Sequence, residues 1–158
     1  MIYTEMTKKA VNLMYEKHKD QKDKSGLPYV FHPWHVAESM DDEISTVVAL
    51  LHDVVEDTDT TMEDIRGMGF PEEVCRSLGL LTHDKNTAYE EYIVRISADP
   101  VAAKVKLSDL KHNSDLTRLP EHDAKALIRL EKYERCMAFL EGRRESPYAD
   151  PTDGGDNA

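Results

Sequence analysis

Cysteine, long apolar runs and basic residues are all scarce in this sequence. Its two cysteines, Cys75 and Cys136, form no CxxC pair, which is typical of core thiols in a reducing compartment and predicts a cytoplasmic location. No apolar run approaches the roughly 20 residues that span a bilayer, and the N-terminus lacks the apolar stretch of a signal peptide, so no membrane partner is expected. Lys and Arg number 20 against 31 Asp and Glu, for a net charge of −11. That deficit argues against a nucleic-acid partner and means that a phosphorylated substrate would need local cations.

Strand-like alternation of apolar and polar residues is missing too, and no internal repeat is present. Helical spacing recurs instead over residues 4–20, 33–40, 44–57, 61–67, 71–81, 89–96, 99–115 and 121–141. Residues 29–31 are expected to be extended, and the proline after His32 biases that residue away from the helical region. With 158 residues, of which 40% are hydrophobic, we predict a single all-α helical bundle over residues 1–144 and a disordered tail over residues 145–158.

The central predicted helix carries charge where apolar residues dominate. Residues 44–55 are apolar on nearly every side, yet His52, Asp53, Glu56 and Asp57 lie within or directly after them. The helical repeat places His52 next to Glu56 and Asp53 next to Asp57 on one face. Because buried charge without a partner is costly, this face needs compensation. A metal ion is the simplest candidate, since imidazole and carboxylate groups are its common ligands.

Two further segments offer ligands from other elements. His32 lies in Phe-His-Pro-Trp-His, and Asp109 lies between apolar residues in a predicted helix, where Lys106, Asp109 and Asn113 share a face. Together with the His-Asp pair of the central helix, they would supply two nitrogens and two oxygens. That set suits Mn or Fe, with Zn or Mg also compatible. On spacing alone, a structural role remains open, in which these polar groups simply pair with one another.

Three ordered motifs support a more specific interpretation. They are Ser-Gly-Leu-Pro-Tyr-Val-Phe-His-Pro at 25–33, Ala-Leu-Leu-His-Asp-Val-Val-Glu-Asp-Thr at 49–58 and Lys-Leu-Ser-Asp-Leu-Lys-His-Asn at 106–113. In this order they resemble the HD-domain metal-dependent phosphohydrolases. More narrowly, they resemble the hydrolase half of the Rel/SpoT alarmone enzymes and the stand-alone small alarmone hydrolases.

The resemblance implies a metal-dependent hydrolase of a phosphorylated guanosine nucleotide, (p)ppGpp, from which it would remove the 3′-pyrophosphate. Glu56 and Asp57 would position or deprotonate the attacking water. A bound cation lowers the pKa of its water, and an adjacent carboxylate can then accept the proton. The cofactor would be one divalent metal, usually Mn, and its implied ligands are His32, His52, Asp53 and Asp109.

The resemblance implies substrate contacts at Lys24, Ser25 and Asn113, and Lys106 is a further candidate that could neutralise phosphate, with an ordinary surface lysine as the alternative. The chain departs from the family in the same region, since Asp23 replaces a common arginine and Leu27 replaces a usual acid. Arg118 is a candidate to replace the missing cation. These departures leave open an HD phosphohydrolase for another phosphorylated nucleotide such as NADPH, and a non-catalytic nucleotide-sensing module is the rival from another class. His83, His112 and His122 receive no role, and no oligomeric state is indicated.

Overall fold

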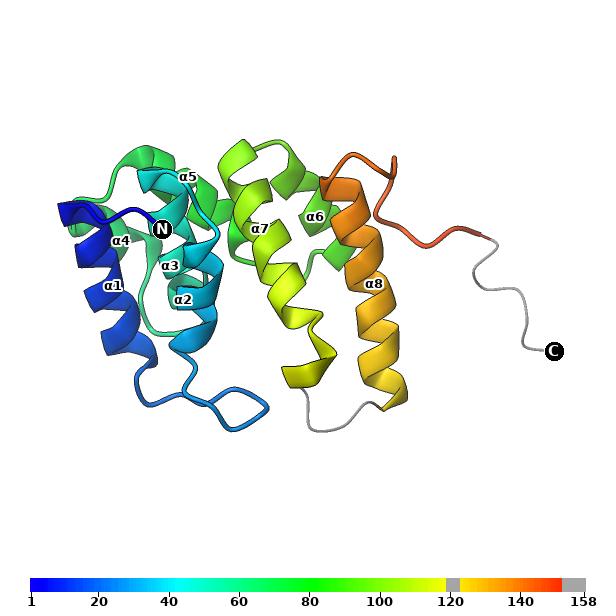
Figure 1. The fold of residues 1–158 in the computed structure, drawn as a ribbon. Coiled ribbons are helices and arrows are strands. Elements are labelled where there is room, and N and C mark those ends of the chain that lie inside the picture. The colour runs from blue at the N-terminus through cyan, green and yellow to red at the C-terminus, as the bar shows by residue number, and fades with distance from the viewer. Residues whose placement is uncertain (119–122, 152–158) are drawn as a thin grey trace.

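The computed structural model describes residues 1–118 and 123–151, and within those ranges it contains helices and no strand (Figure 1). The all-α prediction is therefore confirmed. In the described part of the chain, no helix combines the length and the apolarity needed to cross a membrane. The elements are α1 (Glu5–His18), α2 (Phe31–Glu38), α3 (Glu43–Asp57), α4 (Met62–Gly67), α5 (Glu72–Leu81), α6 (Tyr89–Ser97), α7 (Pro100–Asn113), the 3₁₀ turn η1 (Leu116–Arg118) and α8 (Ala124–Leu140).

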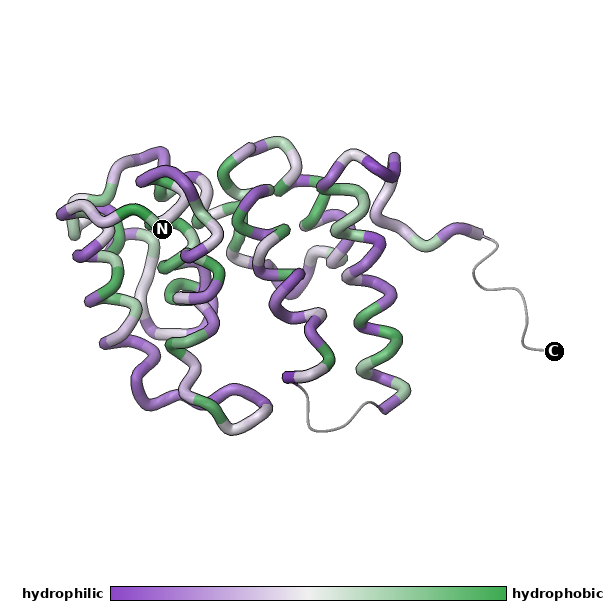
Figure 2. Tube along the Cα trace, in the orientation of Figure 1, coloured by the Kyte–Doolittle hydropathy of each residue, from purple (hydrophilic) through white to green (hydrophobic). Residues whose placement is uncertain are grey.

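Helix α3 is the centre of the molecule. Asp42 is its N-cap: the Asp42 side chain accepts a hydrogen bond from the backbone N–H of Ser45 at 2.8 Å, which satisfies one free donor of the first turn. Every residue from Ser45 to Val54 is buried, and the helix packs against α1, α2, α5 and α7. Burial of each Val or Leu on it contributes about 1.5–3 kcal/mol. In Figure 2, by contrast, the helices at the two sides of the molecule, α1 and α8, carry many polar residues.

Helix α7 joins the two sides of the fold. Asp99 caps it by accepting from the backbone N–H of Ala102 at 2.9 Å, and Pro100 occupies its first position, where a missing N–H has no consequence. The helix contacts α2, α3 and α5 on one side and α6 and α8 on the other. Figure 1 shows α8 lying alongside α7, on the side away from α1. Residues on α7 can therefore meet side chains from both halves.

Helix α2 begins earlier than the sequence indicates. We expected extended chain over residues 29–31 and a helix from Pro33, but the helix starts at Phe31 and includes His32. The proline lies in the first turn, where backbone N–H groups have no acceptor within the helix, so it does not interrupt the hydrogen-bond ladder. His32 is consequently held on a rigid helical turn, with its side chain buried.

The C-terminal segment is described only in part. Arg144 donates from Nε to the carbonyl of Ser146 at 2.8 Å and from Nη2 to that of Tyr148 at 2.7 Å, so the backbone of residues 146–148 is held by the Arg144 side chain. Residues 119–122 and 152–158 lie outside the described ranges. The start of the last predicted helix at residue 121 and the disordered tail predicted over residues 145–158 therefore stay predictions.

Candidate metal centre and catalytic site

Three helices bring the predicted metal ligands together. His32 comes from the first turn of α2, His52 and Asp53 from the buried part of α3, and Asp109 from the inner face of α7. All four are at least nine-tenths buried. One possible ligand atom from each of His32, His52 and Asp109 lies within 4.8 Å of those of the other two, close enough for one ion to contact all three.

The carboxylates face the Nε2 atoms of both histidines. Asp109 Oδ1 lies 3.1 Å from His32 Nε2 and 3.8 Å from His52 Nε2. Asp53 Oδ2 lies 3.1 Å from His52 Nε2 and 3.7 Å from His32 Nε2. The hydroxyl of Tyr29 donates to the same Asp53 oxygen. The two Nε2 atoms and the Asp109 carboxylate therefore lie around one point between the helices, and the Asp53 carboxylate, which is not part of that group of three, contacts the same two nitrogens.

The donor arrangement at His52 fits a cation. Its Nδ1 lies 2.6 Å from the carbonyl oxygen of Ala49, and because a carbonyl only accepts, that nitrogen carries the proton. Nε2 is then the lone-pair atom, and in the described structure it is buried without a hydrogen-bond partner. A lone pair that faces two carboxylates is unfavourable unless a proton or a cation lies between them.

Titration shifts at the centre have the same electrostatic origin. Burial alone would lower the pKa of His52, but the carboxylates of Asp53 and Asp109 raise it well above its usual value. Burial would raise the pKa of Asp53, yet the opposite charge on His52 holds it at about 2. The site therefore favours positive charge between two ionised carboxylates, which is the requirement of a divalent ion.

Lys106 and Asn113 contact Asp109. Lys106 Nζ lies 2.8 Å from Asp109 Oδ2, and Asn113 Nδ2 donates to Oδ1 at 2.8 Å. The ammonium of Lys106 also lies 5.7 Å from the Tyr89 ring centroid and 5.3 Å from that of Tyr92. Although burial raises the pKa of Asp109, the charge on Lys106 and the histidine contacts hold it well below its usual range. Both residues thus orient the Asp109 carboxylate, and their substrate contacts stay predictions.

Glu56 and Asp57 occupy the end of α3, one turn beyond His52 and Asp53. Both are exposed, and Glu56 Oε1 accepts the backbone N–H of His83 at 3.1 Å. Although parts of both residues reach solvent, the protein around the carboxyl groups desolvates them, and this effect together with the charge of Asp53 raises the pKa of both. A carboxylate with a raised pKa is a stronger base than an ordinary one. The pair is therefore suited to accept a proton from water.

A cavity of about 330 Å³ opens beside the centre and reaches His32. It is bounded by the loop between α1 and α2, the end of α7 with η1, and α8. Of the predicted substrate residues, Lys24, Ser25 and Asn113 line it, whereas Lys106 does not belong to its lining. The lining includes four cations and two carboxylates, namely Lys22, Lys24, Arg118 and Arg129 with Asp23 and Asp115. The cavity is therefore locally basic on an acidic protein.

Asp23 has a structural role in the loop that borders this cavity. Its Oδ1 accepts from the backbone N–H and the hydroxyl of Ser25 and from the backbone N–H of Leu27. Gly26 completes the turn with φ of 83°, a left-handed conformation that favours glycine. Asp23 Oδ2 lies 3.5 Å from Arg118 Nη2. Arg118 therefore does border the cavity, paired with the acid that stands where the family commonly has an arginine.

Sequence reasoning gave no role to Arg129, Tyr133 or His112. Arg129 and Tyr133 are one turn apart on α8 and line the cavity, a spacing that could have identified them as one face. His112 is three residues after Asp109 on the same helix, and its Nδ1 lies 2.7 Å from Nδ1 of His32. Its position on the Asp109 face was the available signal.

Three relatives found by sequence comparison carry the same enzyme name. No protein-family model matches the chain. It is 36% identical to the guanosine-3′,5′-bis(diphosphate) 3′-pyrophosphohydrolase MESH1 of Danio rerio over 85% of this chain and 82% of that protein. Identity to MESH1 of Homo sapiens is 37%, over 69% of this chain and 68% of that protein. Identity to the guanosine-3′,5′-bis(diphosphate) 3′-pyrophosphohydrolase of Aquifex aeolicus is 35%, but the chain spans only 18% of that protein's length.

The fold itself resembles a solved structure described as "A metazoan ortholog of SpoT hydrolyzes ppGpp and plays a role in starvation responses". The TM-score is 0.74 at 25% identity, and the match covers 93% of this chain and 92% of that one. The similarity therefore extends over nearly the whole of both chains.

Proposed function

The chain belongs to the Rel/SpoT-like family of HD-type hydrolases, and from that premise we propose that it removes the 3′-pyrophosphate from (p)ppGpp. The observation that carries the proposal is the convergence of two histidines and two carboxylates from α2, α3 and α7 beside a basic cavity. Imidazole Nε2 atoms that face two buried carboxylates need positive charge between them, which a divalent ion would supply.

We propose that the site holds one divalent metal, with Mn²⁺ as the preferred candidate, and that its ligands are His32, His52, Asp53 and Asp109. The set of two imidazole nitrogens and two carboxylates suits Mn or Fe, with Zn and Mg compatible. When bound, such an ion lowers the pKa of a coordinated water and offsets phosphate charge. The protein's own contribution is to hold the four donors rigidly: Tyr29 donates to Asp53, and Lys106 and Asn113 donate to Asp109.

The water-activating role is proposed for Glu56 and Asp57. In the reaction, the water oxygen bonds to the phosphorus attached to the ribose 3′-oxygen, and the bond between that oxygen and phosphorus breaks. One water proton goes to the Glu56–Asp57 pair, which then returns a proton to the departing 3′-oxygen, so that a free 3′-hydroxyl and pyrophosphate are released and the pair is again ionised. Burial and the charge of Asp53 raise the pKa of the Asp57 carboxyl, which supports the proposal that the pair acts as the base.

Substrate binding is proposed for the cavity. Lys24 and Ser25 on the α1–α2 loop and Asn113 at the end of α7 line it, and its excess of cations would offset the repulsion between a polyphosphate and a chain with net charge −11. Lys106 is not part of the cavity lining, and we propose that it affects substrate binding only by orienting the Asp109 carboxylate. A cytoplasmic enzyme without a nucleic-acid partner fits the two free, buried cysteines and the acidic surface.

A second substrate class is favoured by one observation. Asp23 is used to build its own loop and to pair with Arg118, so the family's usual cation is not presented from that position. Another phosphorylated nucleotide such as NADPH is therefore the alternative substrate.

The test is a turnover panel with the purified chain. The protein is stripped of metal, reloaded with Mn²⁺, and incubated separately with ppGpp, pppGpp and NADPH, and the products are separated by ion-exchange chromatography. Pyrophosphate with GDP from ppGpp supports the proposal. Release of phosphate from NADPH, without turnover of ppGpp or pppGpp, would show that the second substrate class is the right one. Binding of a nucleotide without turnover of any of them would indicate a sensor.

A further inference from the structure

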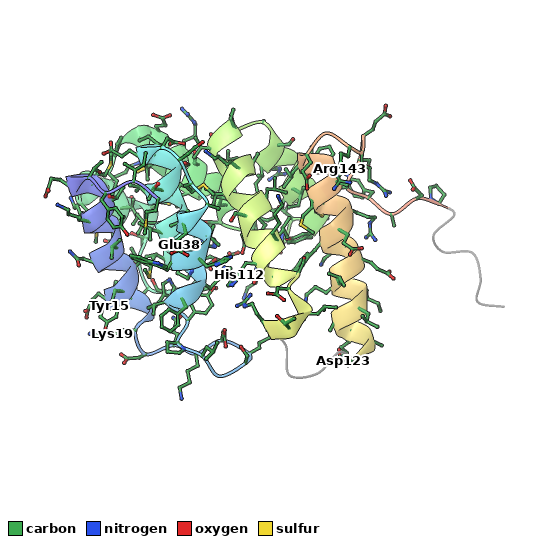
Figure 3. All side chains as sticks on the ribbon, in the orientation of Figure 1. Tyr15, Lys19, Glu38, His112, Asp123 and Arg143 are labelled. Atoms are coloured by element: carbon green, nitrogen blue, oxygen red, sulfur yellow. The ribbon has the colours of Figure 1, made fainter. Side chains whose placement is uncertain are left out.

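His112 lies beside the metal centre, in contact with His32. It projects from the last turn of α7 toward α2 (Figure 3). Its Nδ1 is 2.7 Å from Nδ1 of His32, and the two rings are 13° from parallel with centroids 4.9 Å apart. His35, one turn further along α2, stacks on His112 with a centroid distance of 4.1 Å.

The contact between the two Nδ1 atoms restricts where the protons can be. A hydrogen bond between two nitrogens needs one that carries a proton and one with a lone pair, and a neutral imidazole carries its single proton on only one nitrogen. If His112 were the donor, His32 would carry its proton on Nε2, which lies 3.1 Å from Asp109 Oδ1. That arrangement would prevent His32 from acting as a ligand.

We propose that His112 is a positioning residue for the metal centre: its Nδ1 accepts the Nδ1–H of His32 and thereby keeps the lone pair of His32 on Nε2. The inference rests on the metal site proposed above. It gives the two histidine ligands matching support, because His52 is held in the same tautomer through the carbonyl of Ala49. Partners of this kind fix the orientation of a ligand ring and its protonated nitrogen.

The surroundings of His112 keep its ring in place. Arg118 Nη1 donates to the backbone carbonyl of His112 at 2.7 Å, and His35 covers the ring. Because Arg118 also lines the cavity, the end of α7 that carries His112 is tied to the same residue that borders the proposed substrate site. The acceptor is a neutral ring, which increases the basicity of His32 less than a carboxylate would.

Metal affinity tests the proposal without any substrate. His112→Phe keeps an aromatic ring beside His35 but removes the acceptor, and His112→Asn keeps a side-chain acceptor near the position of Nδ1. His35→Phe is the matched control, since His35 stacks on His112 without a hydrogen bond to a proposed ligand. By titration calorimetry with Mn²⁺, His112→Phe should bind about 10–100-fold more weakly than wild type. The Asn variant should recover most of that loss, and the control should bind like wild type.

Ring-nitrogen NMR of the Zn²⁺-loaded protein provides the second readout. In wild type, Nδ1 of His32 should carry the proton, whereas in metal-free His112→Phe both tautomers should be populated. Equal Mn²⁺ affinity for wild type and His112→Phe, or a His32 Nδ1 without a proton in the loaded wild type, would overturn the proposal. If wild type binds no divalent ion, the metal site itself is wrong and the inference is wrong with it. Melting in EDTA checks folding, and should the Phe variant be unfolded, the Asn variant and the wild-type NMR decide.

Discussion

Replacing Lys106 by methionine should destabilise the metal-free chain by about 3–4 kcal/mol. The side chains of Lys106 and Asp109 are only 13% and 7% exposed, with Nζ 2.8 Å from Oδ2. Removing one partner of such a buried pair costs about 3–5 kcal/mol because the other charge is left uncompensated. In the variant, His32 and Asn113 still contact Oδ1 of Asp109, so we expect a loss of stability near the lower end of that range. Methionine keeps an apolar stem of similar length, but not the cation–π contribution of the ammonium with Tyr89 and Tyr92, which is about 0.5–2 kcal/mol.

The pH dependence of this difference has a defined sign. Lys106 helps to hold the pKa of Asp109 well below 3.8, and despite burial Asp109 raises the pKa of Lys106 well above 10.5. The acid therefore contributes stability above its unfolded pKa, near 3.9, that is lost as pH falls through the lower folded value. The amine contributes below its unfolded pKa, near 10.4, and that contribution is lost as pH rises through the higher folded value. The difference between wild type and variant should be flat from about pH 5 to pH 9 and shrink in acid.

Urea denaturation followed by circular dichroism in EDTA measures the effect. Lys104→Met is the matched control two residues earlier on α7, where the lysine is 38% exposed and pairs with Asp41 and Asp42. A surface pair contributes about 0–1 kcal/mol. The double variant Lys106→Met with Asp109→Asn should be less destabilised than the sum of the two single changes. A Lys106→Met loss no larger than that of the control, without coupling to Asp109, would refute the argument. If Lys106→Met left stability unchanged but raised KM for ppGpp, Lys106 would contact the substrate directly, as predicted from the sequence.

Four further predictions test the site and its support. Asp53→Asn should lose most bound Mn²⁺ and activity together, measured by elemental analysis and pyrophosphate release; full metal retention would exclude Asp53 as a ligand. Glu56→Gln should keep the metal, lower kcat about 10²–10⁴-fold and remove the acid limb of the pH–rate profile, which burial and Asp53 place above pH 4.5; an unchanged profile would exclude it as the base. Arg129→Met, in the cavity lining, should raise KM for ppGpp about tenfold at unchanged melting temperature, as expected for loss of a charged hydrogen bond that contributes about 1.5 kcal/mol; an unchanged KM would place the substrate elsewhere. Leu50→Ala, at a fully buried position of α3, should cost about 2–5 kcal/mol in urea, and a smaller loss would mean that α3 packs loosely.

The helices and the ligand candidates could be inferred from the sequence because both depend on local patterns. Apolar spacing identified α3 and placed charge on one of its faces, and ordered motifs pointed to His32 and Asp109 on other elements. The start of α2 was wrong by two residues, since the bias of a residue before proline is weaker than the packing that holds His32 in the first turn. Side-chain partners were less accessible. Lys106 and Asn113 were expected on substrate, and the structure places both against Asp109.

The sequence by itself determined the chemistry that this protein can offer: a charged face on a buried helix, two histidines, two carboxylates and an acid pair beyond them. Tertiary structure decided how those groups are used. The contact between His32 and His112 joins residues 80 positions apart, and the pairing of Asp23 with Arg118 joins the α1–α2 loop to the end of α7. Such contacts depend on how α2 packs against α3 and α7, which is set by burial summed over the whole core. No local pattern carries that information, so the orientation of each ligand could be read only from the folded chain.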